Sequence, residues 1–236
     1  MDFACFPLVP YANRIAQGRF SFEGREVSLP VLPKFAPHAL HGEGWLKPWH
    51  VIEHRRSSLM LGLGGGGEAW PWRYEARQKI ELSDSGASIA LSLTNRDDER
   101  MPAGLGLHPY FPCQSDGRLE AAVEGVWIGD SIVPDRLAPL RHASWEGSKL
   151  VEMPFVDHCY EGWSGFASVS DRGGTTILSS AAKRLHVYVP PRQGYFCLEP
   201  VTHRPDVFNQ AAPGEQGFTV LAPGETLSLE MTIARL

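Results

Sequence analysis

Hydrophobic residues alternate with polar or small residues along most of this 236-residue chain. The alternation is clearest over residues 74–82, 89–93, 185–189 and 227–233. Successive side chains of a strand point to opposite faces of its sheet, so this pattern is typical of strands with one buried and one solvated face. Such strands favour antiparallel sheets. No stretch of about 12 or more residues has a convincing helical period.

Turn-forming sequences separate these strand-like segments. They include Glu23-Gly24, Asp84-Ser85-Gly86 and Ala222-Pro223-Gly224, and the chain holds 24 glycines and 19 prolines in all. We therefore predict an all-β fold, a large antiparallel β-sandwich, in a single domain over residues 1–236 because no linker divides the chain. Four consecutive glycines, Gly64 to Gly67, lack the Gly-Lys-Ser/Thr ending of a phosphate-binding P-loop. We expect them to form a mobile surface loop.

Charge and composition exclude several functions. The net charge is -5 and no basic run occurs, so we expect no nucleic-acid partner. The apolar stretches are shorter than the ~20 residues that span a bilayer, and no secretory signal opens the chain, so we expect no membrane association. Four scattered cysteines without a repeated spacing are typical of reduced thiols, which favours a cytoplasmic protein.

Two motifs about ninety residues apart suggest acid–base chemistry. His108-Pro109-Tyr110-Phe111 follows a glycine-punctuated strand, and Leu198-Glu199-Pro200 ends another apolar run. A general acid and a general base must be different groups with different pKa values, and an imidazole and a carboxylate form a usual pair. The apolar flank of Glu199 is expected to raise its pKa by desolvation. Taken singly, His108 would more often be a structural histidine, and Glu199 would equally well be one half of an ion pair.

Further polar candidates lie elsewhere in the sequence. Asn13-Arg14 offers a guanidinium fork for hydroxyls or carboxylates, although a lone Arg is more often in a surface ion pair. His38 and His41 are three residues apart, but no HExxH or HxH metal motif is present, and we expect no metal site. Asp157 follows an apolar run and is alternatively a turn residue. Tryptophans 45, 49, 70 and 72 could stack on a sugar ring, but for most tryptophans core packing is the better expectation.

In combination these residues resemble the aldose 1-epimerase (mutarotase) family, from about residue 6 to the C-terminus. The matching elements are Asn13-Arg14-Ile15, His41-Gly42, His108-Pro109-Tyr110-Phe111, Asp157, Glu199-Pro200, Pro205-Asp206 and Phe208-Asn209. The resemblance implies a β-sandwich with a carbohydrate cleft, an isomerase that acts on a small-molecule sugar, and no metal or organic cofactor. It assigns Glu199 as the general base, His108 as the general acid at the ring oxygen, and His41 as its assistant. Asn13, Arg14 and Asp157 would bind the sugar.

The start of the chain departs from the family pattern. Members carry further strands before the Asn-Arg motif, whereas this chain begins at Met1-Asp2-Phe3, close to that motif. We therefore expect a sandwich that lacks those strands, with an exposed sheet edge that a homodimer could cover.

Three other functions stay open at this point. One is a sugar-binding β-sandwich without turnover. Another is a hexose-6-phosphate 1-epimerase, for which Arg73, Arg77 and Arg192 are the available cations. The most distant alternative is a metal-dependent, cupin-like isomerase.

Overall fold

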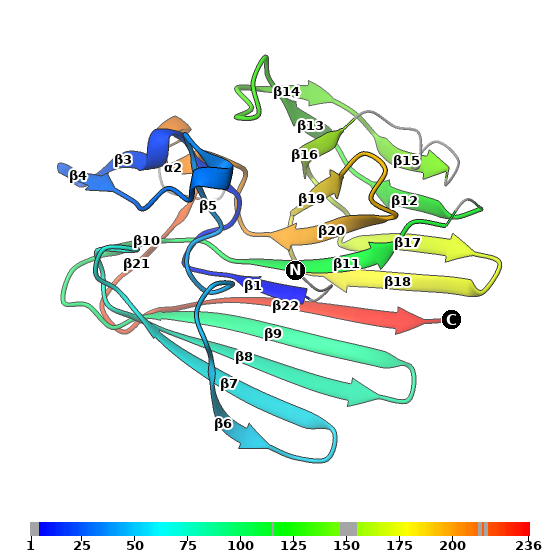
Figure 1. Ribbon diagram of the computed structural model, residues 1–236, viewed down its shortest axis with the longest axis horizontal. Coiled ribbons are helices and arrows are strands. Elements are labelled where there is room, and N and C mark those ends of the chain that lie inside the picture. The colour runs from blue at the N-terminus through cyan, green and yellow to red at the C-terminus, as the bar shows by residue number, and fades with distance from the viewer. Residues whose placement is uncertain (1–4, 115, 147–154, 212–213, 215–216) are drawn as a thin grey trace.

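Two large antiparallel sheets that face each other form most of the structure, a computed structural model (Figure 1). It describes residues 5–114, 116–146, 155–211, 214 and 217–236. The seven-stranded sheet has the order β1 (Cys5–Leu8), β11 (Gly106–Pro112), β20 (Tyr195–Val201), β19 (Arg184–Val189), β16 (Val156–Glu161), β13 (Gly125–Ile128) and β14 (Arg136–Pro139). The nine-stranded sheet has the order β15 (His142–Glu146), β12 (Arg118–Ala122), β17 (Phe166–Asp171), β18 (Gly174–Ser180), β22 (Thr226–Arg235), β9 (Gly86–Asn95), β8 (Tyr74–Ser83), β7 (Ser58–Gly65) and β6 (His50–His54).

Small elements gather beside one end of the sandwich (Figure 1). They are the strand pairs β2 (Arg14–Ile15) with β5 (Ala39–Leu40), β3 (Arg19–Phe22) with β4 (Arg25–Ser28), and β10 (Met101–Ala103) with β21 (Thr219–Leu221). The helical segments are η1 (Ala16–Gly18), η2 (Pro33–Phe35) and α2 (Val207–Gln210). Among the described residues, no helix has the length and apolar character that crossing a membrane requires.

The alternation of hydrophobic residues determines which face of each strand enters the core. In the seven-stranded sheet, Leu107, Val187 and Leu198 are completely buried and belong to the main hydrophobic cluster. Residues one position away in the same strands, such as His108 and Glu199, point to the opposite face because strand side chains alternate. The all-β antiparallel sandwich predicted from the sequence is confirmed, and the four predicted alternating segments lie in β8, β9, β19 and β22.

The glycine run differs from its prediction as a mobile surface loop. Gly64 and Gly65 are the last two residues of β7, and Gly65 pairs with Tyr74 of β8. A Cβ atom on Gly65 would lie 2.0 Å from the Tyr74 ring, so the side chain of Tyr74 passes where any other residue would collide with it. The prediction was wrong for these two residues because their strand pairing depends on a distant segment of the chain.

Strand β1 lies at one edge of the seven-stranded sheet, and β6 lies at one edge of the nine-stranded sheet. All residues of β6 are exposed, and its pairing with β7 shifts between Val51 and Glu53 as a β-bulge. Bulges and charged residues are common protections of sheet edges. The edge expected where N-terminal strands are missing stays a prediction, because β6 does not lie at the start of the chain. Residues 1–4, which include Met1-Asp2-Phe3, lie outside the described residues.

Candidate active site

One row of side chains crosses the outer face of the seven-stranded sheet. Phe6 pairs with His108, and His186 pairs with Glu199. The register that pairs Gly106 with Val201 also brings His108 level with Glu199. Directly opposed residues in antiparallel strands point to the same face. The sheet therefore places two histidines and one carboxylate, from three adjacent strands, next to one another.

Asn13 and His41 reach this face from the loops beside β2 and β5. Both have left-handed backbone conformations, with φ of 56° and 60°. They bind each other twice: the His41 N–H donates to the Asn13 carbonyl at 2.9 Å, and the Asn13 N–H donates to His41 Nδ1 at 3.0 Å. Non-glycine residues in this conformation persist only where the surroundings enforce it, and they concentrate at functional sites. The two loops therefore hold each other in place.

Gly42 allows the His41 loop to approach the chain at Val9. Its φ is +66°, and a Cβ atom there would lie 2.3 Å from the Val9 carbonyl oxygen. We expect Gly42→Ala to lower the free energy of unfolding by more than about 1 kcal/mol, because it adds a steric collision to the cost of a left-handed alanine. Gly24→Ala is the matched control, since Gly24 has φ of +81° with nothing within 4 Å. Urea unfolding of both variants measures the difference, and equal losses would contradict the collision.

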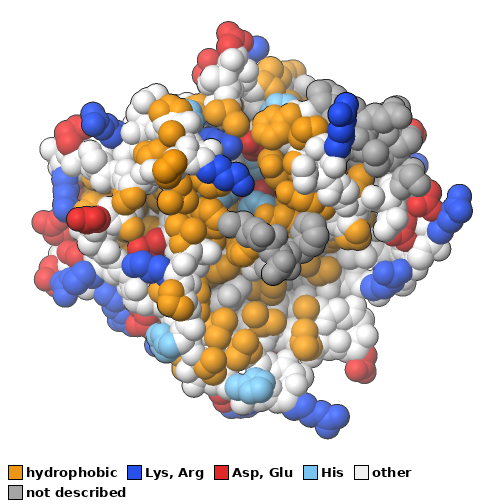
Figure 2. Space-filling model, in the orientation of Figure 1, with side chains coloured by type: hydrophobic (Ala, Val, Ile, Leu, Met, Phe, Trp, Pro, Cys, Tyr) orange, Lys and Arg blue, Asp and Glu red, His pale blue; other side chains and the backbone are white. Residues whose placement is uncertain are grey.

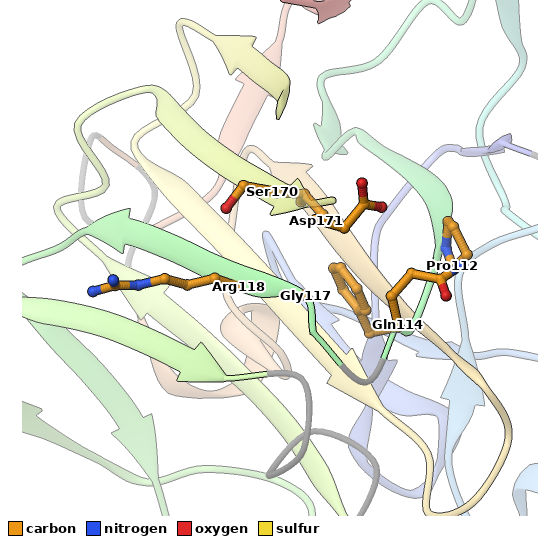
Figure 3. Close-up of a pocket in the computed structure, with 8 residues that line it drawn as sticks. Pro112, Gln114, Gly117, Arg118, Ser170 and Asp171 are labelled. Atoms are coloured by element: carbon orange, nitrogen blue, oxygen red, sulfur yellow. The ribbon is translucent and has the colours of Figure 1, made fainter. Parts of the chain in front are cut away.

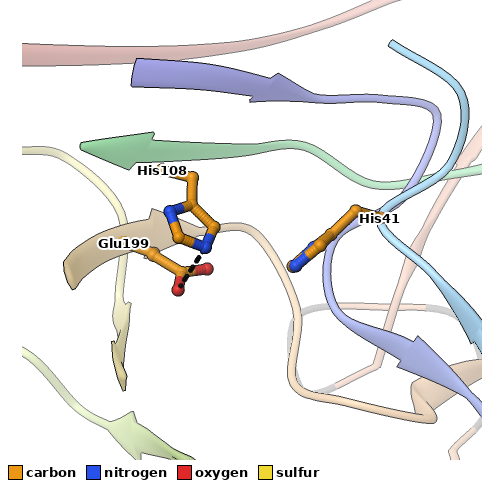
Figure 4. A group of neighbouring side chains, drawn as sticks. All are labelled: His41, His108 and Glu199. Carbon is orange, nitrogen blue, oxygen red and sulfur yellow. Dashed lines mark ion pairs between the residues drawn. The ribbon is translucent and has the colours of Figure 1, made fainter. Parts of the chain in front are cut away.

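His108 and Glu199 form a buried pair with His41 beside it (Figure 4). His108 Nε2 lies 3.2 Å from Glu199 Oε1. The residues are 8 % and 1 % exposed. Two atoms of the pair, Glu199 Oε2 and His108 Nδ1, are buried without a hydrogen-bond partner among the described residues. Figure 4 shows the His41 imidazole pointing toward the pair, with ring centroids of His41 and His108 5.5 Å apart.

Burial shifts the proton affinities of these groups in opposite directions. Desolvation, with a smaller contribution from Asp157, raises the pKa of Glu199 well above its ordinary value. Desolvation also lowers the pKa of His108 to about 4. The pair therefore holds a single exchangeable proton over the pH range between the two values. Opposed shifts in neighbouring groups are typical of acid–base sites.

The donor atoms of His41, His108 and Glu199 all lie within 4.8 Å of one another, as in a metal site. The hydrogen bonding of His41 does not fit metal binding. Burial, together with the neighbouring His108, lowers the pKa of His41, which keeps the ring neutral. Its Nδ1 accepts the Asn13 N–H, so the ring proton lies on Nε2. A metal-binding histidine instead donates its other ring N–H to an acceptor. His41 therefore presents a proton donor to the site.

Arg14 and Asp157 form an ion pair beside the acid–base pair. Arg14 Nη1 lies 2.9 Å from Asp157 Oδ2, and their side chains are 14 % and 6 % exposed. Burial opposes ionisation of Asp157, but the hydrogen bond from His186 and the charge of Arg14 outweigh it and lower the pKa of Asp157 to about 2. A fixed guanidinium and carboxylate offer donors and acceptors for adjacent hydroxyl groups. We call Arg14 and Asp157 the hydroxyl clamp.

Asp206 holds the backbone of the clamp residue Arg14 and of the neighbouring Ala16. Its N–H donates to the Arg14 carbonyl at 2.7 Å, and its Oδ1 accepts the Ala16 N–H at 2.8 Å. Asn209 donates to the same carboxylate at 2.7 Å. This contact gives a structural reason for the Pro205-Asp206 and Phe208-Asn209 elements of the sequence resemblance.

Aromatic side chains surround the polar centre, as Figure 2 suggests where charged and histidine side chains lie in a hollow bordered by hydrophobic ones. The Trp45 ring lies 6.1 Å from that of His41, and the Tyr110 ring stacks on His108 at 5.0 Å. Trp70 and Trp72 are instead core residues, 0 % and 2 % exposed, as expected for most tryptophans. Trp45 is therefore available to a ligand in a way that Trp70 and Trp72 are not.

Other polar residues singled out in the sequence lie outside this centre. Arg73 pairs with Asp98 at 3.1 Å, and Arg77 pairs with Glu75 at 2.5 Å. Arg192 is exposed with φ of 59°. The His38 Nδ1 accepts the Gln17 N–H at 3.3 Å. None of these contacts joins the acid–base pair.

A separate small pocket lies where the ends of β11, β12 and β17 meet (Figure 3). Pro112, Gln114 and Asp171 line it, and Figure 3 shows the Arg118 side chain extending away from them. The Arg118 guanidinium pairs with Glu120 at 2.8 Å. The lining residues include no acid–base pair, so we do not regard this pocket as the active site.

All six residues proposed from the sequence meet in one place: Glu199, His108, His41, Asn13, Arg14 and Asp157. His186 was missed. Its signal was present, because the alternation over 185–189 already placed His186 and Tyr188 on the face opposite to the buried Leu185. Alternation alone does not say which neighbours a side chain meets.

Comparison with known proteins agrees with this fold. The sequence profile of the family described as aldose 1-epimerase matches residues 2–234. A crystal structure from Escherichia coli K12, described provisionally as an aldose 1-epimerase, superposes with a TM-score of 0.84 at 28 % identity, covering 99 % of this chain and 84 % of that one. A galactose mutarotase-like protein from Clostridium acetobutylicum shares the fold, with a TM-score of 0.86 at 18 % identity over 99 % of this chain and 79 % of that one.

Sequence relatives are similar to this chain over different lengths. The uncharacterized protein YphB of Escherichia coli K12 is 31 % identical over 98 % of this chain and 83 % of its own length. An aldose 1-epimerase of the same organism is 29 % identical over 43 % of this chain and 30 % of its own length. The antiparallel sandwich and the family match are those of a mutarotase-like sugar epimerase. The chain belongs to the aldose 1-epimerase family.

Proposed function

We propose that this protein interconverts the α and β anomers of a neutral aldohexose, without a metal or organic cofactor. The observation that carries the proposal is the buried pair of His108 and Glu199, 3.2 Å apart, with a Glu199 oxygen that has no hydrogen-bond partner in the part of the chain that the structure describes. That oxygen, Oε2, is a free acceptor for a substrate proton. Family membership supports the reaction class, and the geometry supports the assignment of roles.

The reaction moves one proton at each of two oxygens. In the reactive form of the pair, its single proton lies on His108 and Glu199 is ionised. Glu199 removes the proton from the anomeric hydroxyl as His108 gives its proton to the ring oxygen, so the C1–O5 bond breaks and a C1 aldehyde forms. Rotation about C1–C2 presents the other face of the aldehyde. His108 then removes the proton from the O5 hydroxyl while Glu199 returns one to the carbonyl oxygen. The enzyme ends in its starting protonation state, as an isomerase must.

The remaining residues bind and orient the sugar. His41 presents its Nε2–H toward the His108–Glu199 pair and would stabilise negative charge that develops on a substrate oxygen. The hydroxyl clamp would hold the sugar so that its anomeric carbon faces the pair. Asn13 supports both groups: its N–H donates to His41 Nδ1 at 3.0 Å, and its Oδ1 accepts the Arg14 N–H at 2.8 Å.

The opposed pKa shifts predict the pH dependence of kcat/KM. The active pair carries one exchangeable proton, so activity falls when a second proton is added, near the lowered pKa of His108 at about 4. Activity falls again when the last proton leaves, on the alkaline side, at the raised pKa of Glu199. We expect a bell-shaped profile whose acid limb lies well below 6.5. Anomer exchange measured across pH checks this, and an acid limb near 6.5 would contradict the burial of His108.

A neutral sugar is favoured over a hexose 6-phosphate by the charge of the clamp. Arg14 is paired with Asp157, so the two side chains together carry no net charge toward a phosphate. Of the other cations considered, Arg73 and Arg77 are paired elsewhere, and Arg192 is an exposed residue with φ of 59°. Competition of plain D-glucose against D-glucose 6-phosphate separates these possibilities, and tighter binding of the phosphate would overturn the neutral-sugar assignment.

Anomer exchange tests the proposal as a whole. Fresh α-D-glucose and α-D-galactose are followed by polarimetry with and without protein, in the presence of EDTA. We expect acceleration that EDTA leaves unchanged. Sugar binding by calorimetry without acceleration would instead indicate the non-catalytic sugar-binding alternative, and acceleration lost in EDTA would indicate metal dependence. The cytoplasmic location and the homodimer stay predictions from the sequence.

A further inference from the structure

His186 lies at the centre of the outer face, between the acid–base pair and the hydroxyl clamp. Its backbone pairs with Glu199 on one side and Cys159 on the other. It is 1 % exposed. Its Nε2 lies 2.6 Å from Asp157 Oδ1, whereas Arg14 contacts the other carboxylate oxygen at 2.9 Å. Both oxygens of Asp157 are therefore anchored, one by each partner.

The neighbouring hydrogen bonds indicate which ring nitrogen of His186 donates and which accepts. An ionised carboxylate only accepts, so the His186 proton that faces Asp157 lies on Nε2. The Asn13 Oδ1 accepts the Arg14 N–H at 2.8 Å, which leaves the Asn13 amide nitrogen as the donor. That nitrogen lies 3.1 Å from His186 Nε2 and 3.3 Å from His186 Nδ1. Because Nε2 carries the proton that faces Asp157, only Nδ1 can accept from the Asn13 amide. Both ring nitrogens of His186 are thus occupied by protein groups.

We propose that His186 is a positioning residue, which holds Asp157 in place so that Asp157 and Arg14 form a preassembled clamp for sugar hydroxyls. This proposal deepens the proposed function and rests on it. His186 does not face the reacting atoms, because Asn13 and Asp157 use its two nitrogens. Its effect reaches the substrate only through the orientation of the carboxylate.

The physical advantage of this arrangement is preorganisation. With Arg14 as its only partner, the Asp157 carboxylate could turn about its Cβ–Cγ bond, and sugar binding would have to restore the productive orientation. The second hydrogen bond from His186 removes that freedom before the sugar arrives. The same bond partly compensates the burial of a charged group, since buried charges require hydrogen-bond partners.

Two substitutions at this position test the proposal. His186→Phe removes the hydrogen bond and keeps the ring volume, and we expect it to weaken the binding of D-galactose, measured by calorimetry, about tenfold. We expect KM to rise by a similar factor and kcat to change less. His186→Gln retains an N–H donor and should remain within about threefold of the wild type. His54→Gln, on exposed β6, is the control and should change neither constant.

A double-variant cycle with Asp157→Asn tests whether His186 acts through Asp157. In the Asp157→Asn background, we expect His186→Phe to change the Kd by less than about twofold. Additive effects on Kd, or an unchanged Kd in a folded His186→Phe, would overturn the proposal. Thermal unfolding of each variant establishes that it is folded, and His186→Gln supplies the comparison if His186→Phe does not fold.

The outcome remains distinguishable from failure of the proposed function. If the wild type binds D-galactose without accelerating anomer exchange, the catalytic proposal fails and the Kd ratios still test His186. If no sugar binds, proton NMR of the histidine imidazoles tests whether His186 donates to Asp157. A hydrogen-bonded Nε2–H resonance should be present in the wild type and lost in Asp157→Asn, and its absence from the wild type would overturn the proposal.

Discussion

Glu199→Gln is expected to lower kcat for anomer exchange by about 10³-fold or more, with the Kd for sugar changed only a few-fold. The amide has nearly the shape of the carboxylic acid but cannot accept the anomeric proton. Glu199 is 1 % exposed, so bulk water has no direct route to replace it as the base. Polarimetry gives kcat, and calorimetry with the same sugar gives the Kd.

The same variant should not lose stability. Glu199 Oε2 is buried with no hydrogen-bond partner among the residues that the structure describes, and desolvation disfavours the charged carboxylate. Replacing a poorly compensated buried ionisable group by a neutral one is often neutral or stabilising. We expect the Tm of Glu199→Gln to equal or exceed that of the wild type. A lower Tm together with lost activity would indicate that Glu199 supports the fold, which contradicts its assignment as the base.

His108→Gln is expected to lower kcat by about 10²-fold or more, because the ring oxygen loses its proton donor. The pH profile should also change shape. In the wild type, activity falls at high pH because the pair loses its last proton. Without His108 no proton on the pair is needed, so residual activity should instead rise with pH as Glu199 ionises above its raised pKa. The buried pair predicts this change because its two groups share one proton.

A matched substitution separates this effect from general disturbance of the sheet. Tyr110→Phe keeps the ring that stacks on His108 at 5.0 Å and lies two residues along the same strand. We expect it to retain the bell-shaped profile of the wild type. If His108→Gln also retains that profile, then another group is the acid, and His41 becomes the first candidate.

Local sequence patterns predicted the secondary structure well, because strand alternation depends only on neighbouring residues. The segments over 74–82 and 227–233 lie in β8 and β22, and Glu23-Gly24 forms the turn between β3 and β4. Gly65 was misread because its need for glycine arises from Tyr74 on the next strand. Steric needs of this kind become visible only once the strands are paired.

The candidate site was predicted from several motifs taken together, because each residue alone has an equally ordinary structural explanation. These residues are Arg14, His41, His108, Asp157 and Glu199. Their meeting depends on sheet register, which brings His108 level with Glu199 across β11 and β20. The role of His186 could not be predicted, because its contact with Asp157 joins residues 29 positions apart on neighbouring strands. The left-handed conformations of Asn13 and His41 were equally hidden, as they result from mutual hydrogen bonds across 28 positions.

The central claim is that the His108–Glu199 pair catalyses anomer exchange. NMR exchange spectroscopy at anomeric equilibrium tests it most directly, because cross-peaks between the α and β signals of D-galactose or D-glucose report interconversion without any net reaction. We predict exchange cross-peaks with the wild type and none with Glu199→Gln at equal protein concentration and equal sugar saturation. Equal exchange in both samples, or none with a wild type that binds the sugar, would contradict the claim.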